Sequence, residues 1–193
     1  RRVGRGTQFA LAATKMAVED AGLDIGQMDS VRVGVCLGTT MADIQALEAV
    51  DKTWVTSGDR HVPASLIPRY PGYAMSVNVA KQFHLRGPVL MIPTACAAGN
   101  YALAYAFDLL QLDKTDLMIA GGADPFSRIA FMGFNRLFAA APERCQPFDR
   151  HRKGILLGEG AGILVLERLE DALARQAPLY AELLGYGMNC DAN

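Results

Sequence analysis

The segment from Ala97 to Leu110 is the feature that most restricts how this chain can fold. It has the length and composition of a helix, and Asp108 is its only charged residue. A helix that is apolar on nearly every side needs protein around most of its circumference. That requirement fits a layered architecture in which a central helix lies between sheets. We therefore expect an α/β protein with a buried helix at its centre.

Apolar runs separated by glycine and proline divide the rest of the chain into alternating helices and strands. One further helix is expected to begin at a Thr7 cap, to run to Ala21 and to end at Gly22. A second is expected from an Asp43 cap to Thr53, and two more at 73–83 and 169–175. Strands are expected at 31–35, 89–92, 117–120, 155–157 with 162–166 as a hairpin or strand pair, and 179–187. Residues 58–72 carry glycines and prolines and are predicted to be irregular. The pattern predicts one domain over 1–193, with a mixed, mostly parallel sheet flanked by helices.

Two glycine motifs stand out, and the first could suggest a phosphate-binding loop. The first, Gly158-x-Gly160-x-Gly162, is followed by an apolar strand, whereas a dinucleotide fingerprint needs a following helix. Structural glycines at a close approach of two backbones, with Glu159 buried or paired nearby, explain it better. The second, Gly121-Gly122, is expected to form a tight exit turn after the strand at 117–120. We expect no nucleotide cofactor.

Composition restricts the class of partner. Hydrophobic residues make up 51% of the 193 residues and charged residues 20%, the latter below the roughly 25% usual for soluble domains. Some apolar surface is therefore expected to be covered by a partner, most simply in an oligomer. The net charge of -1 offers no basic surface for nucleic acid. No segment has the pattern of a membrane span or a secretion signal.

Cysteine and histidine spacing argues against metal and disulfide frameworks. The four cysteines are far apart and form no Cys-x-x-Cys pair: Cys36, Cys96, Cys145 and Cys190. This usage is typical of a reduced, cytoplasmic protein. His61, His84 and His151 show no ligand spacing, and each is expected on the surface rather than at a catalytic site. No metal site is predicted.

Cys96 has the surroundings of a nucleophile. An apolar strand at 89–92 runs into Pro93-Thr94-Ala95, and the apolar helix begins just after the cysteine. Small neighbours let a carbonyl approach the sulfur, and free N–H groups at a helix start can stabilise a thiolate or an oxyanion. The arrangement parallels the serine nucleophile elbow of hydrolases. A buried, inert cysteine is the alternative that the local pattern leaves open.

The sequence around Cys96 also resembles a known family. Residues 94–99 read TACAAG, which is similar to the active-site cysteine motif of the β-ketoacyl-acyl-carrier-protein synthases of the thiolase superfamily. Agreement continues, in order, through IAGGAD at 119–124, PFDR at 147–150, GEGAG at 158–162 and AELLGYG at 181–187, as far as Asp191. The resemblance covers almost the whole chain.

The resemblance implies one half of a thiolase-like αβαβα layered fold, because such synthases are tandem duplications. It implies that Cys96 accepts an acyl group from an acyl-carrier-protein thioester, with its own backbone N–H as oxyanion donor. Decarboxylative condensation with malonyl-carrier protein, in fatty acid or polyketide synthesis, then depends on two histidines and a lysine from the second half. That half and the family's first strand are expected to be missing here. No cofactor is implied.

The resemblance also gives weaker expectations. Met132-Gly133-Phe134 corresponds to a segment that helps line the acyl pocket, which makes Phe134 a candidate pocket residue. The strand at 89–92 is expected at the twofold interface of a homodimer. The charged loop at 149–153 approaches the active site in relatives, yet Lys153 and Ile155 stand where an acidic residue and a phenylalanine are usual.

Two alternatives remain open at this point. One is a thiolase-like acyltransferase that uses coenzyme A thioesters rather than carrier-protein thioesters. The other is a noncatalytic or half-site subunit that supplies a dimer surface and a carrier-docking surface to an active partner. Retention of the cysteine argues against the second.

Overall fold

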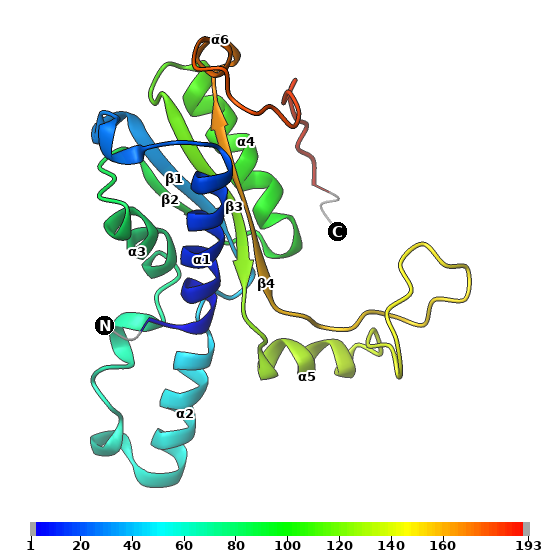
Figure 1. Ribbon diagram of the computed structural model, residues 1–193. Helices are drawn as coiled ribbons and strands as arrows, with labels where there is room; N and C mark the ends of the chain where they lie inside the picture. The colour runs from blue at the N-terminus through cyan, green and yellow to red at the C-terminus, as the bar shows by residue number, and fades with distance from the viewer. Residues whose placement is uncertain (1–2, 191–193) are drawn as a thin grey trace.

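The computed structural model describes residues 3–190 as one twisted sheet with helices on both faces (Figure 1). Asp191, the end of the resemblance, lies outside the described residues. The strands are β1 (Val33–Gly38), β2 (Val89–Ile92), β3 (Leu117–Asp124) and β4 (Gly160–Glu167). The helices are α1 (Arg5–Asp20), α2 (Gln45–Ser57), α3 (Ala74–Gln82), α4 (Ala98–Gln111), α5 (Arg128–Arg136) and α6 (Leu169–Ala174).

The sheet has the strand order β2-β1-β3-β4. The central strand β1 pairs in parallel with β2 and β3, and β4 runs antiparallel to β3. The expected mixed, mostly parallel sheet is therefore confirmed. Every residue of β1 is buried, as in a central strand covered on both faces. The carboxyl ends of β1, β2 and β3 lie at the same edge of the sheet.

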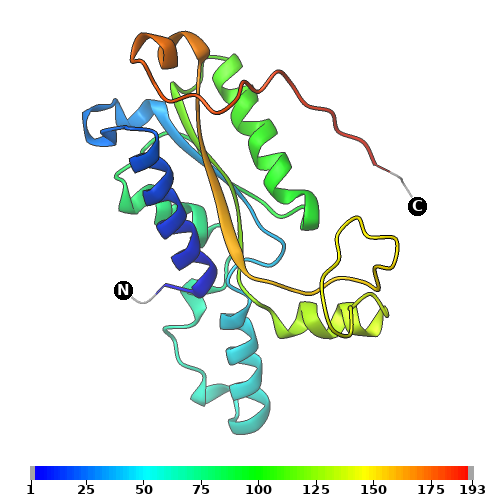
Figure 2. The ribbon, with the colours of Figure 1, turned by 45° about the vertical axis from the view of Figure 1, so that its right-hand side comes forward.

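Side chains alternate between two apolar cores, one on each face of the sheet. On one face, α3 packs against β1 and α1 against β3 and β4, around a core that includes Val33, Val35 and Leu37. On the other, α4 packs against Cys36 and the neighbouring residues of β3. Figure 2 shows α4 alone on that second face, opposite α1. The result is a helix–sheet–helix sandwich with α4 as its outer layer on that side.

The described residues cover the sheet-facing side of α4 and part of its outer side. Ala102, Ala106 and Leu110 are buried against the sheet, whereas Tyr105 is 47% exposed. Leu164 of β4 is 51% exposed. Tyr186 of the C-terminal segment crosses the outer side, where its ring packs edge-on against Phe107. Residues 3–190 therefore do not surround α4 with protein, although its apolar composition requires this.

The predicted cap of α1 is wrong, and so is the predicted cap of the next helix. Thr7 lies inside the first turn of α1, after the N-cap Gly4, and its hydroxyl donates to Asp43. Asp43 Oδ1 accepts the Gly6 N–H at 2.7 Å and the Thr7 N–H at 3.2 Å. Asp43 therefore caps α1 from a distant part of the chain, while α2 begins at Gln45. A side chain at Gly4 would collide with the Asp43 carboxylate.

Several strand boundaries also differ from the predictions. Val31 belongs to a 3₁₀ turn and is 46% exposed, whereas β1 begins at Val33. The alternating pattern of Val31, Val33 and Val35 therefore extends beyond the amino end of the strand. Gly121 and Gly122 do not form an exit turn but lie within β3. Gly121 has a φ of 151°, and a Cβ there would overlap the Gly162 carbonyl oxygen. The expected close approach of two backbones, β3 and β4, is therefore present, but the glycine that it requires is Gly121.

Two expected strands are not formed among residues 3–190. Ile155 makes only an isolated bridge to Ala140, so 155–157 does not pair with 162–166. The segment 179–187 is irregular and mostly exposed. Its apolar composition suits a strand, but no strand among residues 3–190 pairs with it. Helix α5, by contrast, was not predicted. The irregular excursion at 58–72 and the helices at 73–83, 97–110 and 169–175 are confirmed to within a few residues.

Candidate active site at the start of α4

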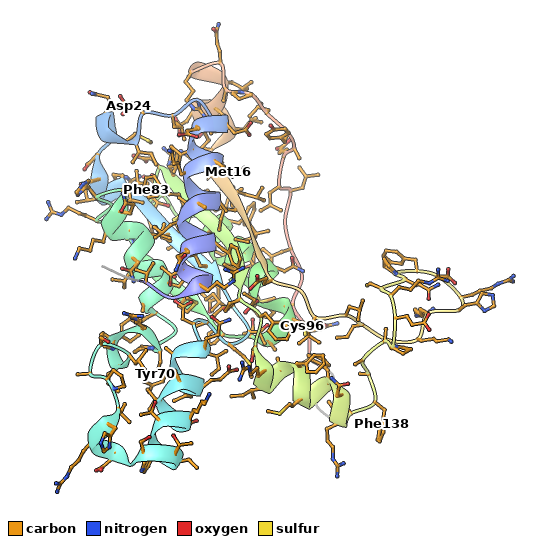
Figure 3. The ribbon with its side chains drawn as sticks, turned by 60° about the horizontal axis from the view of Figure 1, so that its bottom comes forward. Met16, Asp24, Tyr70, Phe83, Cys96 and Phe138 are labelled. Atoms are coloured by element: carbon orange, nitrogen blue, oxygen red, sulfur yellow. The ribbon has the colours of Figure 1, made fainter. Side chains whose placement is uncertain are left out.

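Cys96 lies where β2 turns into α4. It belongs to a single 3₁₀ turn, Ala95–Ala97, that follows Ile92 by a few residues and continues directly into α4 at Ala98. The side chain is exposed. Figure 3 shows Cys96 at the end of the sheet from which α5 projects. Exposure excludes the alternative of an inert cysteine packed in the core.

The turn before Cys96 is strained and tightly packed. Ala95 has a φ of 51°, in the left-handed region that alanine rarely adopts. Helix α4 begins against the end of β1, where a Cβ on Gly38 would lie 2.5 Å from the Gly99 nitrogen and still nearer to the carbonyl group of Ala98. Only glycine at position 38 allows this approach. The position of the Cys96 sulfur therefore depends on the contact between α4 and β1.

The loops at this edge of the sheet are held by a carboxylate. Asp124, the last residue of β3, accepts hydrogen bonds from the Thr39 hydroxyl at 2.7 Å and the Thr40 N–H at 2.8 Å. The Thr39 N–H in turn donates to the Ile92 carbonyl oxygen at 3.1 Å. These bonds link the ends of β1, β2 and β3 beside the turn that carries Cys96. Ligands of open α/β sheets bind outside the carboxyl ends of parallel strands, which is where Cys96 lies.

The backbone around Cys96 offers hydrogen-bond donors. The Ala98 N–H is used by the Ala95 carbonyl within the turn. No hydrogen bond between residues 3–190 uses the N–H of Cys96 itself. A free N–H at the start of a helix can stabilise negative charge on a nearby oxygen. The geometry supports attack by sulfur on a carbonyl, with the Cys96 N–H as oxyanion donor.

The other cysteines have different surroundings. Cys36 is fully buried beneath α4, and burial raises the pKa of its thiol to about 12. A thiol held protonated in an apolar core is a poor nucleophile. Cys145 and Cys190 are exposed, but both lie in irregular segments outside helices and strands. Only Cys96 combines exposure with a strand-to-helix turn.

No hydrogen bond among residues 3–190 joins a histidine to Cys96. His61, His84 and His151 are exposed, as predicted, and lie in the excursion, after α3 and in the charged loop respectively. That loop is itself exposed from Asp149 to Lys153. Within residues 3–190, no three His, Cys, Asp or Glu side chains are grouped so that they could hold a metal ion. None of the helices described there is long and apolar enough to cross a bilayer.

Residues 1–172 match the model of the N-terminal domain of the β-ketoacyl synthases. The chain belongs to the β-ketoacyl synthase family. It is 37% identical, over its whole length, to a 3-oxoacyl-[acyl-carrier-protein] synthase 2 from Staphylococcus aureus, of which it covers 49%. The chain thus spans about half the length of the curated relatives that it matches.

Solved ketosynthases share the fold. The ishigamide ketosynthase/chain length factor aligns with 98% of this chain at 40% identity and a TM-score of 0.94, and 48% of its own chain is covered. A ketosynthase solved with its type II PKS acyl-carrier protein and bound to the hexaketide aligns with 91% at 30% identity and a TM-score of 0.83, with 46% covered. The expected half of a thiolase-like layered fold is therefore confirmed.

Phe134 is the candidate pocket residue of this β-ketoacyl synthase domain. Phe134 lies on α5 and is half-buried. No hydrogen bond or aromatic contact among residues 3–190 links it to the start of α4. Both residues belong to the same end of the sheet. The role of Phe134 in an acyl pocket stays a prediction.

Sequence reasoning missed Asp124 and Gly38, which position the cysteine of the synthase domain without touching it. Asp124 directly follows an apolar run that includes two glycines. A carboxylate at the end of a buried strand could have indicated a residue at the site. Gly38 carried no such signal. Its requirement depends on the backbone of α4, which is about sixty residues away in the sequence.

Proposed function

We propose that this chain is the acyl-accepting half of a β-ketoacyl-acyl-carrier-protein synthase and that Cys96 is its nucleophile. The observation that carries the proposal is the exposed Cys96 at a strained turn leading into α4, with an unused backbone N–H. The names of the relatives, 3-oxoacyl-[acyl-carrier-protein] synthase and ketosynthase, support this chemistry. They include both fatty acid and polyketide enzymes, so the proposal covers both pathways.

In the first step, the Cys96 thiolate attacks the carbonyl carbon of an acyl-carrier-protein thioester. A new C–S bond forms, the old one breaks, and the carrier sulfur leaves as a thiolate that takes up the proton lost earlier by the Cys96 thiol. The Cys96 N–H stabilises the oxyanion of the tetrahedral intermediate. The strand-to-helix turn holds the sulfur where the acyl group can reach it.

In the second step, malonyl-carrier protein loses carbon dioxide, and the electron pair of the broken C–C bond forms an enolate. Its carbon attacks the acyl group on Cys96, a C–C bond forms, and the C–S bond breaks to restore the thiolate. Donors must stabilise the enolate. No histidine of residues 3–190 is hydrogen-bonded to Cys96, so we assign this role to the two histidines that the family resemblance places in the second half.

The same reasoning gives proposals for the partners. We place the second half against the uncovered side of α4, where Tyr105 is exposed, and against the exposed Leu164 of β4. Strand β2 is an edge strand with half-exposed residues, which supports a homodimer built across it. Residues 1–193 then form a single domain of the larger synthase. The free cysteines support a cytoplasmic location.

Acylation of the full-length protein tests the proposal. Incubation with an acyl-carrier-protein thioester should add one acyl mass to the wild type and none to Cys96→Ala. Cys145→Ala, which removes another exposed cysteine, serves as the matched control and should still be acylated. Equal labelling of Cys96→Ala would refute the assignment. Faster acylation from coenzyme A thioesters would favour the thiolase-like alternative, and no acyl-enzyme at all would favour the noncatalytic subunit.

A further inference from the structure

Helix α5 is the least supported helix at the Cys96 end of the sheet. It projects sideways from the body of the domain (Figures 1 and 2). None of its residues is buried, and only Ala130 and Phe134, one turn apart on the same side of the helix, are half-buried. Packing against the described residues therefore does little to fix the direction of α5. Its ends must determine where it points.

The amino end of α5 is bound by a side chain of α2. Glu48 Oε1 accepts the N–H groups of Arg128 at 3.0 Å and Ile129 at 3.3 Å. Ser127 is the N-cap of α5, and its hydroxyl accepts the Ala130 N–H at 3.1 Å. The same hydroxyl lies 3.3 Å from Glu48 Oε1 and donates to it. Glu48 and Ser127 together satisfy the first three N–H donors of α5.

A second bond from α2 strengthens this anchor. The Gln45 side-chain amide donates to the Phe126 carbonyl oxygen at 2.7 Å. Gln45 and Glu48 are three residues apart and therefore lie on the same face of α2. A negative charge at a helix amino end is favourable because the helix dipole and the free N–H groups point toward it. The contact with α2 therefore holds the amino end of α5 and also fixes the direction of the helix.

We propose that Glu48 is a positioning residue that orients α5 and thereby sets the acyl-chain preference of the site. The step from orientation to preference rests on the proposed function, because Phe134 lies in the second turn of α5 and is the candidate pocket residue. A rotation of α5 about its anchored end moves Phe134 relative to the Cys96 end of the sheet. The preference between short and long acyl groups follows that placement.

The experiment compares Glu48→Ala and Glu48→Gln in the full-length protein. Amide hydrogen exchange of residues 130–136 measures the anchor itself. Loss of a cap weakens a helix start enough to speed local exchange about tenfold. Glu48→Ala should show that increase, and Glu48→Gln, which keeps an acceptor oxygen, should restore most of the protection. Unchanged exchange in Glu48→Ala would overturn the proposed anchor.

Acylation rates at Cys96 with a series of acyl-carrier-protein thioesters, from acetyl to palmitoyl, measure the preference. In Glu48→Ala, the ratio of long-chain to short-chain acylation rates should move toward one by about threefold or more. This change is smaller than the discrimination that a direct pocket contact contributes. Glu167→Ala, which removes a carboxylate bound to Arg175 at the opposite end of the sheet, is the control and should slow no chain length selectively. An unchanged ratio in Glu48→Ala would overturn the positioning role. A wild type that is not acylated would instead refute the proposed function, while the exchange data would still test the anchor.

Discussion

Replacing Gly38 with alanine tests the contact that places Cys96. The new Cβ would lie 2.5 Å from the Gly99 nitrogen, whereas ordinary contacts begin near 3.4 Å. The start of α4 would therefore have to retreat from β1 by about 1 Å. Forcing one extra carbon into a close-packed site costs about 1–3 kcal/mol of the free energy of unfolding. A displacement of about 1 Å at a reacting group can slow the reaction by about 10²-fold.

Two measurements on the full-length protein check this reasoning. The rate of Cys96 acylation by a carrier-protein thioester should fall by about 10²-fold, and chemical denaturation should show the loss in unfolding free energy. Gly72→Ala is the matched control, because a Cβ there finds its nearest neighbours at 3.8 Å and its backbone is not in the left-handed region. A Gly38→Ala protein with wild-type stability and acylation rate would show that α4 does not depend on this approach.

Two further predictions concern carboxylates at the same end of the sheet. Asp43→Ala should lower the unfolding free energy by about 2 kcal/mol, because two N–H groups of α1 and the buried Thr7 hydroxyl lose their acceptor; Asp29→Ala, which removes an exposed turn bond, is the control in the same denaturation assay. Glu159 is held by the Arg5 guanidinium and the Phe126 N–H, which lower its pKa from 4.5 to about 2. Because the folded pKa is the lower one, its stabilisation is complete above about pH 4.5 and disappears as the pH falls through about 2. The difference in unfolding free energy between wild type and Glu159→Gln should narrow over that range, and a difference that stays constant down to pH 2 would contradict the pairing.

The local sequence predicted most of the interior of the fold. The strand at 89–92 and the helices at 73–83 and 97–110 are where their apolar patterns place them. These elements satisfy their own backbone hydrogen bonds or lie within continuous apolar runs, so a short window contains the information that they need. The position of Cys96 between a strand and a helix followed from the same patterns.

The boundaries and caps were predicted less well, because distant residues determine them. Asp43 has the right side chain to begin α2 but caps α1 instead, since folding brings the Gly6 and Thr7 N–H groups to it. The segment 179–187 has the composition of a strand, yet an isolated strand is not stable without a partner edge. Its conformation therefore depends on which backbone lies beside it.

The sequence by itself determined that this chain is an α/β protein of the β-ketoacyl synthase family with a cysteine at a helix start. Short-range patterns and a motif of six residues were sufficient for that, because both are properties of neighbouring residues. Only the tertiary structure decided that Gly38 must lack a side chain and that Glu48 holds α5. Both results depend on backbone atoms that are far away in the chain and within contact distance in space.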